Sequence, residues 1–216
     1  MSRTCLVAAL LAVLASCAST PATEPTSAAT DLAAPVASVD PRAKFKDGER
    51  LLRDLSYALD LPRESICSEL SRYDCVNDAF RIVLGGVEGA NLGVQEPLAE
   101  AALTAPIALD RVALHVCITR VQHDLDDPAH AVLLRQAKAS SSGKLRKPDK
   151  AWLRQTASGL YGTILSRDAT PSEAAELVAF YADVSSDGGK ANPDAVKDWV
   201  TLGCFAVASS LESIFY

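Results

Sequence analysis

Hydrophobic residues recur at helical spacing from about residue 44 onward, and each run is bounded by residues that cap or break helices. Phe45, Leu52 and Leu59 lie seven residues apart, which places them on one face of a helix. An Asp followed by a Pro is typical of a helix start. The pattern therefore predicts a first helix that begins after Asp40-Pro41 and ends near Asp60.

The next stretch is divided by proline and glycine into shorter elements. Pro62 predicts a short helix that extends to Leu70, and Asp74 is suited to cap a third helix that ends at a pair of glycines. Residues 85–104 contain those and further glycines without a clean hydrophobic period. Loops of this length often carry function, so we expect a partner surface there.

The most apolar helix of the chain is predicted to begin at Thr104-Ala105-Pro106. Its main stripe includes Val112, and Leu114 and Ile118 widen that stripe over most of the circumference. A helix with so little polar surface has to be buried on several sides. We therefore expect this helix at the centre of the fold.

A short helix and a basic loop are expected after it. Asp127-Pro128 predicts a helix to about Ala139, and residues 140–147 combine serines and a glycine with lysines and an arginine. Such a loop is either solvated or in contact with anionic lipid head groups.

Three amphipathic helices complete the pattern. They follow Pro148, the capping box Thr170-Pro171-Ser172-Glu173, and Asn192-Pro193, and the last reaches Ile214. The sequence thus predicts an all-α fold, a bundle of six to seven helices, in a single domain over residues 44–216.

Composition agrees with a helical domain and narrows the function. Hydrophobic residues make up 49% of the 216 residues but aromatic residues only 6%, so Ala and Leu, which favour helices, carry the excess. The formal net charge of -6 argues against general binding of nucleic acid, which needs a basic surface. We expect no nucleic-acid partner.

The first residues have the order of a secretory signal, with Arg3 before a short apolar run. The run closes with Leu14-Ala15-Ser16-Cys17, which resembles the lipobox of bacterial lipoproteins. The resemblance implies a signal peptide over 1–16, acyl chains on Cys17 as the membrane anchor, and, because Ala18 is not an Asp, sorting to the outer membrane. The alternative is an ordinary signal in which Cys17 is incidental. Residues 17–43 are rich in Pro, Ala, Ser and Thr and predict a flexible, disordered tether.

Four cysteines remain after Cys17, an even number in a compartment that permits disulfides. We predict that Cys67 pairs with Cys75 across a short corner. Cys117 and Cys204 should then join two long helices near their middles. Buried free thiols and a metal cluster are the alternatives, and the spacing lacks the close pairs of a zinc site.

One connection between predicted helices has the spacing of ligand residues that is typical of a calcium-binding loop. Asp183, Ser185 and Asp187 alternate before a glycine, and Asp194 stands at the twelfth position. This resembles an EF-hand loop, although Lys190 and Pro193 depart from that pattern. The alternative is a polar connection in which Asn192 caps the next helix. Calcium is the one cofactor that the sequence suggests.

Other candidate groups do not form a recognisable catalytic set. Ser141 and Lys144 have the spacing of a Ser-Lys nucleophile, but they lie in a loop instead of at a helix start. His115 is expected to pack on the central helix, whereas His123 and His130 flank a turn and should be solvated. We therefore expect a protein without enzymatic activity.

Residues 152–181 resemble helical segments of bacterial envelope proteins that associate with c-type cytochromes. The resemblance is carried by the phrase 160–173, in which a helix end is followed by the capping box. It implies an accessory subunit of a periplasmic redox system. The leading expectation is instead a non-enzymatic adaptor, stabiliser or assembly factor for a larger envelope complex, such as one for transport or surface motility, and a calcium-binding lipoprotein is the third.

Overall fold

The computed structural model describes residues 45–70, 72–87, 93, 96, 103–135, 137, 145, 147–187 and 189–215. The expected signal peptide, Cys17 and the tether to residue 43 lie outside the described residues. So do the basic loop, apart from two positions, and most of the 85–104 segment in which we expected a partner surface.

The fold is predominantly helical, as the sequence predicted. The α-helices are α1 (Gly48–Leu59), α2 (Ala105–Asp126), α3 (Lys150–Leu165), α4 (Pro171–Val184), α5 (Ala195–Ala208) and α6 (Leu211–Ile214). Shorter turns are 3-10 helices at Arg63–Ser65 and Pro128–His130 and a π-helical turn at Cys75–Ala79. Strands of two residues form two antiparallel hairpins, β1 (Ser68–Glu69) with β2 (Tyr73–Asp74) and β3 (Ser186–Asp187) with β4 (Lys190–Ala191).

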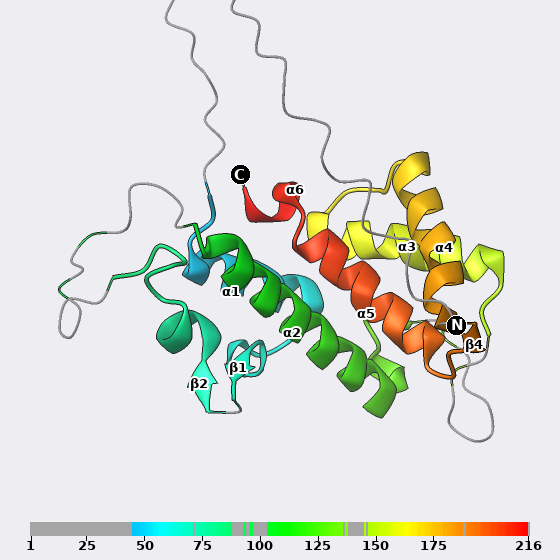
Figure 1. Ribbon diagram of the computed structural model, residues 1–216, viewed down its shortest axis with the longest axis horizontal. Helices are drawn as coiled ribbons and strands as arrows, with labels where there is room; N and C mark the ends of the chain where they lie inside the picture. The colour runs from blue at the N-terminus through cyan, green and yellow to red at the C-terminus, as the bar shows by residue number, and fades with distance from the viewer. Residues whose placement is uncertain are drawn as a thin grey trace, which may run out of the picture. The chain divides into compact units, whose positions relative to one another are not determined.

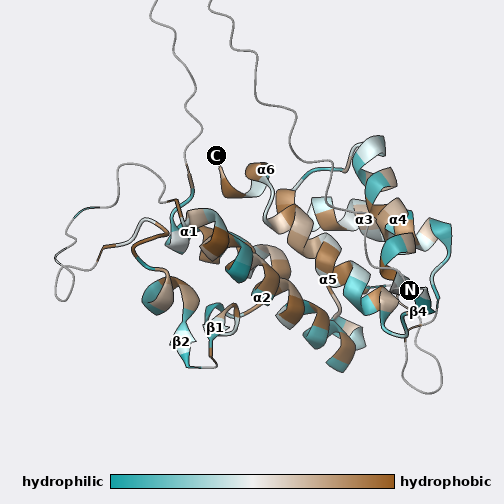
Figure 2. Cartoon of the chain, viewed as in Figure 1, coloured by the Kyte–Doolittle hydropathy of each residue, from teal (hydrophilic) through white to brown (hydrophobic). Residues whose placement is uncertain are grey.

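The core lies where α2 and α5 run side by side and α3 and α4 pack against α5 (Figure 1). Figure 2 shows hydrophobic residues along α2 and α5. Trp199 is fully buried in this core, and its indole N–H donates to the Leu177 carbonyl oxygen at 2.8 Å. The rings of Trp152 and Tyr181 lie 5.9 Å from that of Trp199. The bulk of this aromatic cluster supplies the apolar contact area that holds three helices together.

Several predicted helix starts are confirmed by their caps. The Asp74 carboxylate accepts hydrogen bonds from the amides of Val76 and Asn77. The helix predicted from there to the glycine pair was too long, because the structure has only the π-helical turn Cys75–Ala79, followed by turns. At α4, Thr170 accepts from the Glu173 amide while the Glu173 carboxylate accepts from the Thr170 amide, which is the reciprocal capping box.

The first helix starts later than the sequence predicted. Its cap is Asp47, whose carboxylate accepts from the Arg50 amide at 2.7 Å, and Phe45 forms an extended bridge with Phe215. The Gly48 amide donates to the Leu84 carbonyl, so this helix end is fixed by a segment far along the chain. The prediction after Asp40-Pro41 was wrong because Asp47 caps the helix instead, and the contact with Leu84 fixes that start.

Two predicted short helices are only single turns. After Pro62, one 3-10 turn gives way to the β1–β2 hairpin, which the Cys67–Cys75 disulfide closes. After Pro128, the chain extends at Ala131. There the Asp124 carboxylate accepts hydrogen bonds from the backbone amides of residues 132, 133 and 134. In a continuing helix the amide of residue 132 would instead donate to the carbonyl oxygen of residue 128.

The last two predicted helix boundaries also move. Asn192 does not cap α5, because its carboxamide donates to the Val184 carbonyl and to Asp198 and accepts from the Asp194 amide. The C-terminal helix, predicted as continuous to Ile214, ends at Ala208. Ser210 then caps the short α6 by accepting from the Ser213 amide.

Within the part of the chain that the structure describes, no helix has the combination of length and hydropathy that crossing a membrane requires.

Candidate docking surface

A groove of about 590 Å³ opens on the surface between α2 and α5. Its apolar lining consists of Leu114, Ile118 and Val121 from α2 and Leu202 from α5, with Val184 at the end of α4. This volume lies within the roughly 300–1,000 Å³ of sites that enclose a bound group. The groove is therefore large enough to accept bulky apolar side chains.

The disulfide between Cys117 and Cys204 fixes the distance between α2 and α5, the two helices that line this groove. Both cysteines are fully buried, and their Cα atoms lie 5.8 Å apart. Because Cys117 uses the side of α2 that faces α5, its neighbour Ile118 is turned outward and is 50% exposed. The pairing confirms the sequence prediction, whereas the expected burial of Leu114 and Ile118 was wrong.

Polar groups of the second hairpin and of α5 form the rim of the groove. Asp183 is exposed at the rim, beside Ser186 and Lys197. Asp198 is half-buried and accepts the Asn192 carboxamide N–H at 3.0 Å, which holds the rim against the end of α4. An apolar floor with a partly acidic rim favours an apolar group that carries a positive charge at its edge.

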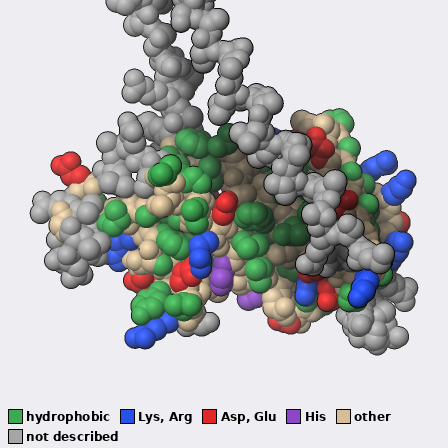
Figure 3. Space-filling model, viewed as in Figure 1, with side chains coloured by type: hydrophobic (Ala, Val, Ile, Leu, Met, Phe, Trp, Pro, Cys, Tyr) green, Lys and Arg blue, Asp and Glu red, His purple; other side chains and the backbone are tan. Residues whose placement is uncertain are grey.

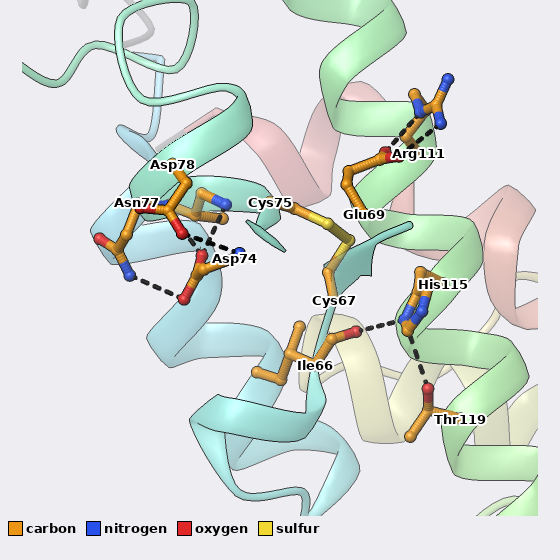
Figure 4. Close-up of a disulfide and its surroundings, with 11 residues drawn as sticks. Ile66, Cys67, Glu69, Asp74, Cys75, Asn77, Asp78, Arg111, His115 and Thr119 are labelled. Carbon is orange, nitrogen blue, oxygen red and sulfur yellow. Dashed lines mark hydrogen bonds and ion pairs between the residues drawn. A yellow bond between two sulfur atoms is a disulfide. The ribbon is translucent and has the colours of Figure 1, made fainter. Parts of the chain in front are cut away.

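The β1–β2 hairpin stands beside the same exposed side of α2 (Figure 4). The disulfide Cys67–Cys75 confirms the second predicted pairing and joins the two ends of the hairpin. Glu69 accepts two hydrogen bonds of 2.7 Å from the Arg111 guanidinium, a bidentate geometry. The disulfide thus closes the hairpin, and the ion pair fixes the hairpin on α2.

A third contact joins the hairpin base to α2. The Nδ1 atom of His115 lies 2.9 Å from the Ile66 carbonyl oxygen, and since that oxygen only accepts, the imidazole N–H donates. The Thr119 hydroxyl lies 3.4 Å from the same nitrogen. His115 is therefore a packed residue, as expected, and not an open ligand.

The tip of the hairpin presents apolar surface to solvent. Leu70 is 86% exposed and Tyr73 is 43% exposed. The Arg72 guanidinium carbon lies 5.3 Å from the centre of the Tyr73 ring. Leu70 has φ 54°, a left-handed conformation that costs roughly 1–2 kcal/mol in residues with a Cβ. The fold thus holds a bulky apolar side chain in water on a strained backbone, which is a common property of functional sites.

Figure 3 shows apolar side chains both over this hairpin and along α2, on one face of the molecule. We call this surface the α2 face. Its apolar members are Leu70, Tyr73, Ile107, Leu114, Ile118 and Leu202. Sequence reasoning missed this surface because it assigned every apolar residue of α2 to the core; the excess of apolar positions around α2 was the available signal.

The residues of the proposed calcium loop do not converge in the described part of the chain. The Ser185 hydroxyl donates to the Ala182 carbonyl, and the β3–β4 hairpin occupies the middle of the segment. Asp183 lines the groove, while Asp194 precedes α5 without capping it by its side chain. The side chain of Asp187 lies outside the described residues, so calcium binding stays a prediction.

Other sequence candidates are scattered. His123 is exposed, and His130 pairs with Asp127 at 2.7 Å, which lowers the pKa of the Asp127 carboxyl. Ser141 and Lys144 lie outside the described residues. Among the side chains that the structure describes, no three His, Cys, Asp or Glu residues come together as a metal site would require.

Comparison of the chain with protein-family models, curated proteins and solved structures gives no match. The resemblance of residues 152–181 to cytochrome-associated proteins therefore has no further support. The two disulfides indicate a location outside the cytoplasm, because such bonds persist where the surroundings are oxidising. The chain is an extracytoplasmic helical protein.

Proposed function

We propose that this protein is a non-enzymatic lipoprotein of the bacterial cell envelope, an adaptor that docks a larger envelope complex through the α2 face. Acyl chains on Cys17 hold it at the outer membrane. The observation that carries the proposal is the exposed apolar stripe of α2, in which Ile107, Leu114 and Ile118 recur at helical spacing.

The stripe supports docking because its exposed apolar residues lie near one another on one side of α2. Single exposed apolar residues are common, whereas neighbouring ones with polar surroundings are typical of protein contacts. Ile107 is 63% exposed, and Arg111 lies one turn along α2, between Ile107 and the groove. The disulfide behind the stripe keeps it in one shape, so a partner loses little free energy in ordering it.

The point at which the tether enters the domain also favours this role. The Lys46 amide donates to the Ile214 carbonyl at 2.9 Å, so the entry point lies beside α6. Figure 1 places the β1–β2 hairpin and α6 at opposite edges of the domain. Because the chain enters the domain beside α6, its point of entry does not cover the hairpin or the adjoining part of the α2 face.

Photo-crosslinking in living cells tests the adaptor role. A photoreactive side chain at position 107 of the full chain should capture a discrete envelope protein other than this chain. The matched control is position 57, because Tyr57 is 91% exposed on α1, away from the stripe. Equal capture from both positions, or none from position 107, would show that the stripe is not a docking surface.

A further inference from the structure

We infer that the α2–α5 groove binds the β1–β2 hairpin tip of a second copy of this chain, in a two-fold symmetric dimer. Each copy then supplies both halves of the contact, a tip and a groove. The inference goes beyond the adaptor role and does not depend on it, because both halves belong to the described domain.

The first argument is chemical complementarity. The tip offers Leu70 and Tyr73 as apolar side chains, and Arg72 adds a cation beside them. The groove offers Leu114, Ile118 and Leu202 as an apolar lining. Its rim carries the carboxylates of Asp183 and Asp198 and one cation, Lys197, so acidic groups outnumber basic ones there. An apolar group with a flanking positive charge meets an apolar cavity with a flanking negative charge.

The second argument is geometry. Glu69 and Ile66 bind Arg111 and His115 on α2. Leu114 and Ile118 follow on the same side of that helix at intervals of three and four residues. Tip and groove therefore lie next to each other on one face. A two-fold axis that passes between them carries each tip into the groove of the other copy and closes the contact.

The third argument is the rigidity of the tip. Contacts to α2 and the Cys67–Cys75 bridge hold the strands of the hairpin in place, so the backbone that carries Leu70 is fixed at Glu69 and Tyr73 before it binds. A preorganised bulky side chain that enters a pocket is the arrangement of an interface hot spot.

The contact covers most of the α2 face and leaves its Ile107 end accessible to an envelope partner. Ile107 lies at the other end of the α2 stripe from Ile118 and is not part of the groove lining. An envelope partner and a second copy therefore use different ends of the same stripe.

The test places a photoreactive side chain at position 70 of the full chain, in cells that also produce a copy with a different tag. Crosslinking should join the two tags, and peptide mapping should locate the second end in 114–122 or 183–202. Position 57 serves as the matched control because it is exposed on α1 and outside the predicted contact. Capture of a lipid, of another protein or of no protein from position 70 overturns the inference.

A charge exchange provides the second measurement. Arg72→Glu should lower the yield of the tag-to-tag product by about two- to fivefold, the range expected for one exposed ion pair. Asp183→Arg in the same chain should restore it. An unchanged yield in the first variant, or no recovery in the second, contradicts the proposed pairing. Capture at position 107 reports the adaptor role separately, so either proposal can fail alone.

Discussion

Arg120 and Asp124 form a buried ion pair on α2, with 2.8 Å between the guanidinium Nη2 and the carboxylate Oδ1. Arg120 also donates to the carbonyl oxygens of Leu59 and Asp60 at the end of α1. Asp124 accepts the three backbone amides of residues 132–134. One pair of side chains thus joins the end of α1, the last turns of α2 and the segment that follows α2.

Asp124→Ala should destabilise the domain by about 3–5 kcal/mol, because it leaves a buried guanidinium without its carboxylate and three amides without their acceptor. Urea denaturation measures the free energy of unfolding. The matched control is Asp126→Ala on the same helix, where the carboxylate is exposed and accepts a hydrogen bond from Gln122. This control should change stability by no more than about 0.5 kcal/mol. Equal losses in the two variants would refute the role of the buried pair.

Arg167 links the start of α4 to α6 and makes stability depend on pH. Its guanidinium binds both oxygens of Glu173 and of Glu212 and lies 5.0 Å from the Tyr161 ring centre. The hydrogen bonds from Arg167 lower the pKa of Glu173 from 4.5 to about 2 and also lower the pKa of Glu212. Both carboxylates are more acidic in the folded state, so their stabilising effect is present above pH 4.5 and disappears as the pH falls toward 2.

Arg167→Met should therefore lower the Tm at pH 7, and its difference from the native chain should shrink between pH 5 and pH 2. Added salt should weaken the effect at pH 7, because these side chains are partly exposed. Arg154→Met, at an exposed position of α3, is the control and should show no such pH dependence. A Tm difference that stays constant down to pH 2 would contradict this account.

The sequence predicted helix starts well where a side chain accepts a hydrogen bond from a backbone amide a few residues further along the chain. The capping box at Thr170 and the cap at Asp74 involve residues no more than three positions apart, so the sequence alone reveals them. The pairing of Cys117 with Cys204 was also predictable, because both cysteines lie mid-helix on apolar faces.

Contacts between distant residues decided what the sequence did not show. Asp124 ends the helix predicted after Pro128, and the Gly48 contact with Leu84 fixes the start of α1. For the α2 face, the hydrophobic periodicity places Leu114 and Ile118 on one side of the helix. It does not tell whether another element covers that side. That depends on where α5 packs, which is a property of the whole fold.

The two disulfides should differ in their effect on stability. Cys117 and Cys204 are 87 residues apart, whereas Cys67 and Cys75 are 8 apart. In the loop-entropy model the longer loop is worth up to about 4.6 kcal/mol and the shorter about 2.6 kcal/mol. Replacing Cys117 and Cys204 by Ala should therefore lower the Tm more than the same change at the other pair. The reverse order would show that native packing, and not chain entropy, dominates.

The proposed acylation of Cys17 can be tested by labelling cells and analysing the processed protein. Cys17→Ala should prevent incorporation of a palmitate analogue and leave an uncleaved precursor, because the lipobox would lack the residue that is acylated. Ser16→Ala, which keeps a small residue before the cysteine, is the matched control and should be processed as the native chain is. Persistent labelling of the Cys17→Ala chain would rule out the lipoprotein assignment.

Replacement of Leu70 by Gly should separate stability from binding. Glycine adopts positive φ without steric cost, so Leu70→Gly should raise the free energy of unfolding by up to about 1 kcal/mol. The same change removes the apolar side chain that the dimer needs, so the yield of tag-to-tag crosslinks from position 118 should fall. Leu211→Gly is the control, because Leu211 is exposed in helix α6, and it should not stabilise the domain. A variant at position 70 that loses both stability and dimer would show that Leu70 supports the fold, whereas a gain in stability with loss of the dimer means that the strain is retained for binding.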